Sequence, residues 1–276
     1  MKRNTNVLAA VLLSSALSVG ALAGASSLAL AESDSEADDR EVVCWGDSLT
    51  KGSGADTAVI STPEGFYDAS FKSYPEILED LCGLTTYNYG ASGATSRDVL
   101  RLQEGVIRDY DSDYAVSDRE IVRQSSQHRG DILVLEFGSN GGWDNDYDTL
   151  VAQYRQVISN SDCDDYLILG DTDDPGTSLG DRDQDPFAKG TGTGETAWEA
   201  ALHKAFGDRF INMRLYLVEH GLDVCGLKPT QQDMATASFG WVPHRLRADW
   251  THLNSYGYYA KARGVYERGV QLGMWE

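Results

Sequence analysis

Residues 131–140 read DILVLEFGSN, and the run ILVLEF within this stretch is almost wholly apolar and of strand length. Such a run is typical of a parallel strand that helices cover on both faces. Outward from it, four more apolar runs of strand length occur, at residues 41–45, 85–89, 165–169 and 209–213. Together with residues 131–137, these runs predict five strands.

Helix-like patterns separate the strands, at residues 74–81, 96–110, 146–159, 195–206 and 214–220, with a last one near 255–272. Ser73 and Glu76 have the spacing of a capping box, which predicts a helix start there. Strands that alternate with helices predict a parallel sheet with right-handed crossovers and helices on both faces. Ligands bind beyond the carboxyl ends of the strands in such a sheet, so the residues after each strand are the first candidates for a site.

The amino-terminal segment predicts export. Lys2 and Arg3 precede a long apolar stretch at residues 7–30, and Ala29-Leu30-Ala31 is a small-residue cleavage site. The alternative is a retained membrane anchor, but the change to acidic residues directly after Ala31 favours cleavage there. We therefore expect a secreted protein with a signal peptide at residues 1–31, an acidic disordered leader at 32–40 and one domain at 41–276.

Composition and charge narrow the possible partners. The chain of 276 residues is 41% hydrophobic and 24% charged, so it should fold as a globular protein. Its formal net charge of −20 becomes −22 once Lys2 and Arg3 are removed, and such a surface repels nucleic acid and anionic lipid. No later apolar run approaches the roughly 18 residues of a membrane span.

The cysteines leave their own pairing open. Cys44, Cys82, Cys163 and Cys225 are an even number in an exported chain, which permits disulfides in three possible pairings. Their spacing does not choose among these pairings. None forms a CxxC pair, so a zinc site or a redox dithiol is not indicated, and Cys44 reads as a buried thiol of its strand.

Three polar blocks follow predicted strand ends. Ser48 lies in Gly46-Asp47-Ser48-Leu49, Gly93 lies in the stretch 88–96, and Asn140 follows Gly138-Ser139. Alone, each block is an ordinary strand-to-loop turn or helix cap. As a group they offer a hydroxyl nucleophile, a backbone N–H that a ligand oxygen can approach closely, and a side-chain amide that can donate to an oxyanion.

A fourth block precedes the last predicted helix. Asp249 and His252 are three residues apart, so they can hydrogen-bond within a tight turn, although a lone pair of this kind is more often a surface ion pair or a cap. A serine hydroxyl becomes a good nucleophile when an imidazole takes its proton and a carboxylate orients the imidazole. The four blocks in this order therefore predict a serine hydrolase site.

In these four blocks the sequence resembles the SGNH, or GDSL, hydrolase family over residues 41–270. The resemblance implies a flavodoxin-like three-layer α/β/α sandwich with a five-stranded parallel sheet. It also implies ester hydrolysis through an acyl-serine intermediate, without a cofactor or metal. Ser48 would be the nucleophile, His252 the general base and Asp249 its orienting carboxylate. The Ser48 and Gly93 amides and the Asn140 side chain would form the oxyanion hole.

Other site types fit less well. The family's third block usually continues with Asp after the Asn, and here Gly141 stands in that position, which leaves the support of Asn140 open. A nucleophile elbow of the G-x-S-x-G type fails because Thr50 replaces its second glycine. Residues 144–148 and 181–186 resemble the start of a calcium loop but lack its later glycine and glutamate positions.

The substrate is the least defined part. Trp143 and Trp250 flank the candidate blocks and could form an aromatic wall, and the loop at residues 171–196 should lie on the same rim of the sheet. We expect a secreted serine esterase for a small ester, either an O-acyl carbohydrate or a short-chain lipid ester. The alternative is a non-catalytic extracellular module that binds carbohydrate or a surface on the same fold.

Overall fold

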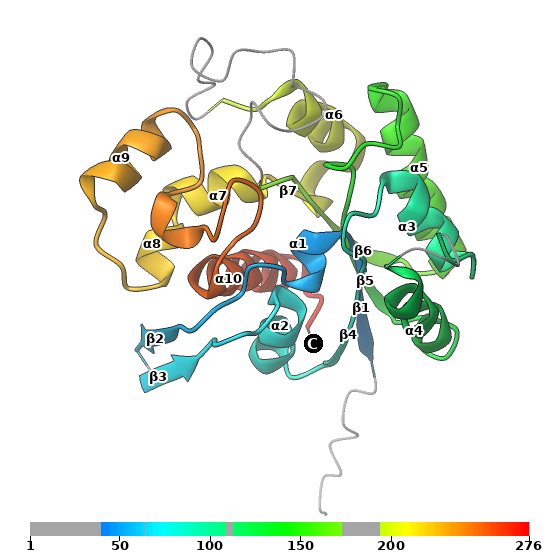
Figure 1. The fold of residues 1–276 in the computed structure, drawn as a ribbon, viewed down its shortest axis with the longest axis horizontal. Coiled ribbons are helices and arrows are strands. Elements are labelled where there is room, and N and C mark those ends of the chain that lie inside the picture. Colours follow the sequence, from blue (N-terminus) through cyan, green and yellow to red (C-terminus); the bar gives the residue numbers. More distant parts are fainter. Residues whose placement is uncertain (1–39, 64, 109–112, 173–193, 276) are drawn as a thin grey trace, which may run out of the picture. The chain divides into compact units, whose positions relative to one another are not determined.

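The computed structural model describes residues 40–63, 65–108, 113–172 and 194–275. Their central feature is one parallel sheet of five strands in the order β4-β1-β5-β6-β7 (Figure 1). The sheet confirms the predicted α/β class, and its strand order is that of a flavodoxin-like fold. The strands are β1 (Glu41–Gly46), β4 (Thr85–Gly90), β5 (Ile132–Glu136), β6 (Asp165–Leu169) and β7 (Phe210–Ile211).

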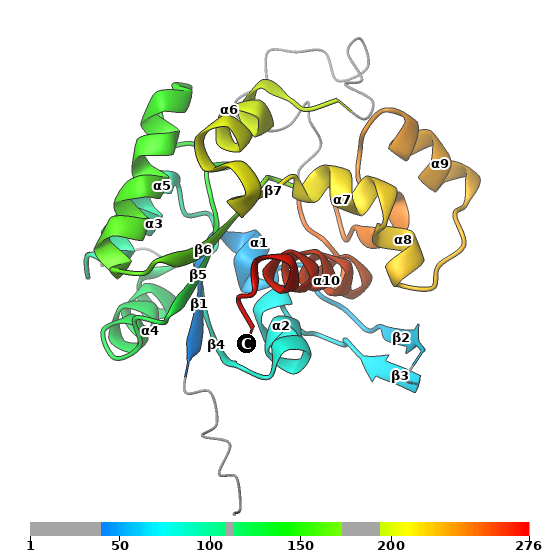
Figure 2. The ribbon, with the colours of Figure 1, turned by 180° about the vertical axis from the view of Figure 1, so that it is seen from behind.

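Helices cover both faces of the sheet, as the apolar character of its strands requires (Figures 1 and 2). Val42 and Cys44 of β1 point into one core cluster, while Val43 and Trp45 point into the other. The first cluster is completed by α2 (Tyr74–Cys82), α7 (Met213–Glu219), α8 (Gly221–Val224) and α10 (Ser255–Leu272). The second is completed by α3 (Ser96–Gln103), α4 (Ala115–Ser125), α5 (Tyr147–Ser161) and α6 (Ala197–Phe206). The three layers are thus helices, sheet and helices.

The register of the sheet brings three strand ends together. Gly46 at the end of β1 pairs with Gly90 of β4 on one side and with Glu136 of β5 on the other. The loops after β1, β4 and β5 therefore leave the sheet side by side. These are the loops on which the sequence placed Ser48, Gly93 and Asn140.

Several elements differ from the sequence prediction. Helix α3 ends at Gln103 rather than at residue 110, because Gly105 follows with φ of +85°, which a continuing helix does not allow. The sequence did not predict α1 (Ser48–Lys51), α4, the hairpin of β2 (Val59–Thr62) and β3 (Gly65–Asp68), or α9 (Gln231–Ser238). Two single-turn 3₁₀ helices were also missed, at Gly207–Arg209 and His244–Leu246. Most of these elements are short and carry little periodic signal.

Other sequence predictions have mixed outcomes. All four cysteines lie in the described part of the chain, and all four are free thiols there. Cys44 is fully buried, as its strand position predicted. None of the helices between residues 40 and 275 that the structure describes combines the length and apolarity needed to cross a bilayer. The predicted signal peptide, almost all of the acidic leader and most of the loop at 171–196 lie outside the described residues.

Candidate active site

Ser48 is the first residue of the short helix α1, directly after β1. The Asp47 carboxylate accepts from the Leu49 N–H at 2.9 Å and so caps this helix. Helix α1 packs tightly on the sheet, because a Cβ at Gly90 would lie only 2.1 Å from the Lys51 nitrogen. The close approach leaves Ser48 only 9% exposed at the carboxyl edge of the sheet, which is where the sequence predicted the nucleophile.

His252 meets Ser48 from the other end of the chain. Its Nε2 lies 3.0 Å from the Ser48 Oγ, and its Nδ1 lies 2.9 Å from the Asp249 Oδ2. An ionised carboxylate can only accept, so in the neutral imidazole Nδ1 carries the proton and donates it to Asp249. Nε2 is then free to accept the proton of the Ser48 hydroxyl. The three predicted residues therefore form one hydrogen-bonded chain.

The Asp249 carboxylate is held by its own loop. Its Oδ1 accepts from the backbone N–H of Thr251 at 2.8 Å and of His252 at 2.7 Å. Partial burial opposes ionisation, but the hydrogen bonds from the backbone and from the His252 side chain outweigh it and lower the pKa of Asp249 below its usual value. Asp249 therefore stays ionised at neutral pH and fixes the tautomer of His252.

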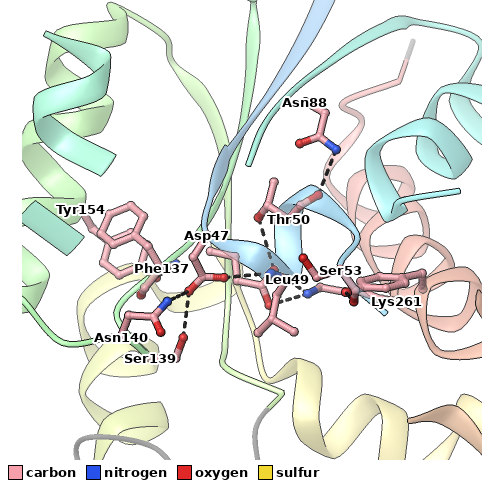
Figure 3. A network of polar contacts seen from close by, with 12 residues as sticks. Asp47, Leu49, Thr50, Ser53, Asn88, Phe137, Ser139, Asn140, Tyr154 and Lys261 are labelled. Carbon is pink, nitrogen blue, oxygen red and sulfur yellow. Dashed lines mark hydrogen bonds and ion pairs between the residues drawn. The ribbon is translucent and has the colours of Figure 1, made fainter. Parts of the chain in front are cut away.

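Asn140 is oriented by Asp47, as Figure 3 shows. The buried Asp47 Oδ2 accepts from the Asn140 Nδ2 at 3.2 Å and from the Ser139 Oγ at 2.8 Å. The same Nδ2 also donates to the Ala94 carbonyl at 3.2 Å. Asp47 and Ala94 thus hold the Asn140 side chain in a chain that has Gly141 where the family usually has aspartate. The Ala94 contact also places Asn140 next to Gly93, which is exposed on the loop after β4.

A buried ion pair that the sequence did not predict lies next to α1. Glu136 at the end of β5 accepts from the Nζ of Lys261 on α10 with both carboxylate oxygens, and both side chains are almost fully buried. Thr50 Oγ1 of α1 lies 3.5 Å from Glu136. Burial raises the pKa of Glu136 to about 7, against the opposing effect of Lys261. The available signal was a glutamate at the end of the apolar run ILVLE.

The two tryptophans of the predicted aromatic wall have different positions. Trp143 is 0% exposed, and its Nε1 donates to the Gly138 carbonyl at 2.8 Å, so its prediction as an accessible pocket wall is wrong. Its ring packs in the core against Tyr147 and Trp198, with ring centres 5.4 Å and 5.6 Å away. Trp250 is 69% exposed next to Asp249, and the Arg247 guanidinium lies over its ring at 5.5 Å. Trp250 is therefore accessible, two residues before His252 in the chain.

A metal site has no support in the described part of the chain, where no three His, Cys, Asp or Glu side chains are grouped so that they could hold an ion. The arrangement instead offers a serine hydroxyl bonded to an imidazole, an ionised carboxylate behind the imidazole, and amide donors beside the serine. Such a set can transfer an acyl group to serine and then to water.

Among the comparisons with known proteins, the family match agrees with this chemistry. The model of the GDSL-like Lipase/Acylhydrolase family matches residues 44–260. No curated protein matches the chain. A similar solved structure is a carbohydrate esterase family 2 enzyme plus carbohydrate-binding domain from Corynascus thermopiles (Myceliophthora fergusii), at 13% identity and a TM-score of 0.50, covering 86% of this chain and 68% of that one. Another is a G-D-S-L family protein from Desulfitobacterium hafniense DCB-2, at 12% identity and a TM-score of 0.46, covering 83% and 99%.

Proposed function

This chain belongs to the GDSL-like Lipase/Acylhydrolase family, and from that membership we propose that it is a secreted serine esterase for small esters. The observation that carries the proposal is the continuous hydrogen-bonded chain from Ser48 through His252 to Asp249. The substrate would be an O-acyl carbohydrate or a short-chain lipid ester. Hydrolysis would proceed through an acyl-serine intermediate.

In the first half of the reaction, the Ser48 Oγ attacks the ester carbonyl and its proton passes to the His252 Nε2. The tetrahedral intermediate then collapses, the C–O bond to the alcohol breaks, and His252 returns the proton to the departing alkoxide. Asp249 stabilises the imidazolium that exists between these two transfers. In the second half, water gives its proton to His252 and attacks the carbonyl carbon of the acyl-serine. This second tetrahedral intermediate collapses, the bond between that carbon and the Ser48 Oγ breaks, and His252 returns its proton to the Oγ. The products are the carboxylic acid and regenerated Ser48.

The negative charge of each tetrahedral intermediate would be held by three donors: the Ser48 and Gly93 amides and the Asn140 side chain. The Ser48 amide suits this role because the first N–H groups of a helix have no intrahelical acceptor. The two N–H groups of the Asn140 side chain donate to Asp47 and to Ala94, each at 3.2 Å, so one of these bonds would be exchanged for the bond to the oxyanion.

A carbohydrate ester is favoured among the substrates by Trp250. This exposed indole, two residues before His252, offers a flat apolar surface on which a sugar ring can stack, on the side away from the Arg247 guanidinium. The similarity to a carbohydrate esterase shows only a shared fold, but it is compatible with this choice. A short-chain lipid ester remains the alternative, and the assay below separates the two.

The direct test is hydrolysis by the purified mature protein of p-nitrophenyl esters of increasing acyl length and of acetylated sugars. We expect turnover of the acetyl esters, loss of turnover with longer chains, and release of acetate from the sugars. The variant Ser48→Ala should be folded and inactive. A folded protein that hydrolyses none of these esters, yet binds the sugars, would instead be the non-catalytic module.

Secretion is tested separately. A host that exports the full-length protein should release a form that begins at Glu32, which mass spectrometry of the protein from the medium can establish. Retention of the intact chain in the membrane fraction would contradict the proposed cleavage after Ala31.

A further inference from the structure

The amide of Gly93 belongs to the peptide group that joins Ser92 to Gly93. The carbonyl of that same peptide, the Ser92 oxygen, accepts from the Nη1 of Arg108 at 2.7 Å. In a trans peptide the C=O and the N–H point in opposite directions and lie in one plane. Whatever holds the Ser92 oxygen therefore also sets the direction of the Gly93 N–H.

Arg108 is itself firmly held. Asp118 on α4 accepts from its Nε at 2.8 Å and from its Nη2 at 2.6 Å, and the Asp118 carboxylate is fully buried. Asp118 also accepts from the Arg108 backbone N–H at 3.2 Å. Such a two-pronged contact fixes the plane of the guanidinium as well as its position. Arg108 thus presents Nη1 to Ser92 from a rigid support.

An aromatic ring completes the support. The Arg108 guanidinium lies 4.5 Å from the ring centre of Tyr114, whose hydroxyl lies 3.5 Å from the point where a Cβ of Gly93 would be. Helix α4, which carries Asp118 and follows Tyr114, packs beside α3 (Figure 1). The loop with Gly93 is therefore supported by Arg108, Asp118 and Tyr114, which lie outside the family's four sequence blocks.

We propose that Arg108 is a positioning residue of the oxyanion hole, which aims the Gly93 amide and strengthens it as a donor. The cation withdraws electron density from the Ser92 oxygen, so the N–H of the same peptide becomes the more polarised. Arg108 acts on the reacting atoms through Gly93, because its contact with this peptide is to the Ser92 oxygen, on the opposite side from the Gly93 N–H. The inference rests on the proposed esterase function.

The test variant must not leave a buried charge unpaired. Arg108→Met alone would strand Asp118, so the informative protein is the double variant Arg108→Met/Asp118→Asn, with Arg108→Lys as a second variant. Lysine keeps the positive charge but lacks the planar guanidinium, so it cannot donate to both Asp118 oxygens and to the Ser92 carbonyl in the same way. Folding is checked by circular dichroism and by the denaturant midpoint.

Arg209 offers a matched control at the opposite edge of the sheet. Its Nη1 donates to Asp165 and to the Tyr166 carbonyl, each at 3.3 Å, and its guanidinium lies 4.7 Å from the Tyr166 ring. It therefore has partners of the same kinds as Arg108, a carboxylate, a backbone carbonyl and a tyrosine ring, at longer distances and a more exposed place at the start of β6. Arg209→Met therefore shows how the loss of an arginine with such contacts changes activity and stability when the peptide between Ser92 and Gly93 is left untouched.

We expect the double variant to lower kcat for p-nitrophenyl acetate by about 10- to 100-fold with little change in KM, because a misdirected donor loses part of the 10²- to 10³-fold that one oxyanion donor contributes. Affinity for a boronic acid, which forms a tetrahedral adduct with serine, should fall in parallel. Arg108→Lys should lie between wild type and the double variant. Arg209→Met should keep the wild-type kcat.

A double variant that is folded and has the kcat of Arg209→Met would overturn the proposal, as would a change in KM alone. Failure of the esterase function is recognised differently, since the wild-type protein would then hydrolyse no ester. If the wild type hydrolyses esters and the double variant keeps the same kcat, the inference about Arg108 is wrong and the proposed function stands.

Discussion

The two halves of the candidate site are held by different means. Ser48 is 9% exposed on a short helix packed between β1, β4 and the buried pair of Glu136 and Lys261. On the other side, the side chains of His252 and Asp249 are 26% and 53% exposed, and their hydrogen bonds come largely from their own turn. The nucleophile half thus depends on the core of the domain, and the base half depends on local backbone geometry.

This difference has a consequence for mutations. A change in the base half should remove activity and leave stability nearly untouched, because little apolar surface or buried charge is lost. A change in the nucleophile half should affect both activity and stability, because the same groups position Ser48 and fill the core.

The largest expected effect is that of His252→Ala. Without the base, kcat for p-nitrophenyl acetate should fall about 10⁴-fold or more, while the free energy of unfolding changes by no more than about 0.5 kcal/mol. The exposed His244 on a neighbouring turn supplies the control, and His244→Ala should leave both quantities unchanged. A large loss of stability in His252→Ala would mean that the base half is not locally held.

Next is Lys261→Met, which should cost about 3–5 kcal/mol of stability in urea unfolding, because it leaves a buried carboxylate without its cation. In this variant, burial and Asp47 keep the pKa of Glu136 above its value in the unfolded chain. The folded state then binds the proton more strongly, so stability is retained at low pH and falls as the pH rises through neutrality.

The double variant Glu136→Gln/Lys261→Met tests whether the stability lost in Lys261→Met comes from the unpaired charge of Glu136. It removes both members of the pair, so most of the lost stability and all of the added pH dependence should be recovered. If the double variant is as unstable and as pH-sensitive as Lys261→Met, the pair does not act as a charge pair.

A smaller effect is expected for Asn140→Ala. Loss of one oxyanion donor should lower kcat by about 10²- to 10³-fold, with little change in KM. The neighbouring Ser139 also donates to Asp47 but has no part in the oxyanion hole, so Ser139→Ala should lower kcat far less. An effect of Asn140→Ala on KM alone would remove this residue from the oxyanion hole.

The smallest effect concerns acid stability. The pKa of Asp249 is lowered in the folded protein, so its contribution to stability is present above the unfolded value of about 3.9 and is lost as the pH falls through the folded pKa. Asp249→Asn should therefore lose less stability than wild type between pH 6 and pH 3, measured by thermal unfolding. Identical curves would show that the turn does not favour the ionised form.

The sequence predicted the sheet and the residues at its carboxyl edge because both depend on local signals. An apolar run such as ILVLEF marks a buried strand, and a polar block directly after it marks the rim. Ser48 and Asn140 were found in this way, whereas His252 was found three residues after Asp249 in the block before the last predicted helix. The structure brings all three to one edge.

What the sequence did not reveal depends on contacts between distant segments. Lys261 sits on a helix whose pattern does not distinguish a buried lysine from an exposed one, and its partner Glu136 is 125 residues away. Arg108 lies in a segment that was predicted as helix, so its contact with Ser92 had no local signal. Trp143 was misplaced because a tryptophan beside a site block packs in the core as readily as it lines a pocket.

Covalent labelling of the folded protein with a fluorophosphonate, followed by peptide mass spectrometry, tests the central claim most directly. We expect one labelled residue, Ser48, and much slower labelling of His252→Ala, because the imidazole activates the hydroxyl. An unlabelled Ser48 in folded wild-type protein, or labelling at the same rate without His252, would mean that Ser48 is not a nucleophile activated by His252.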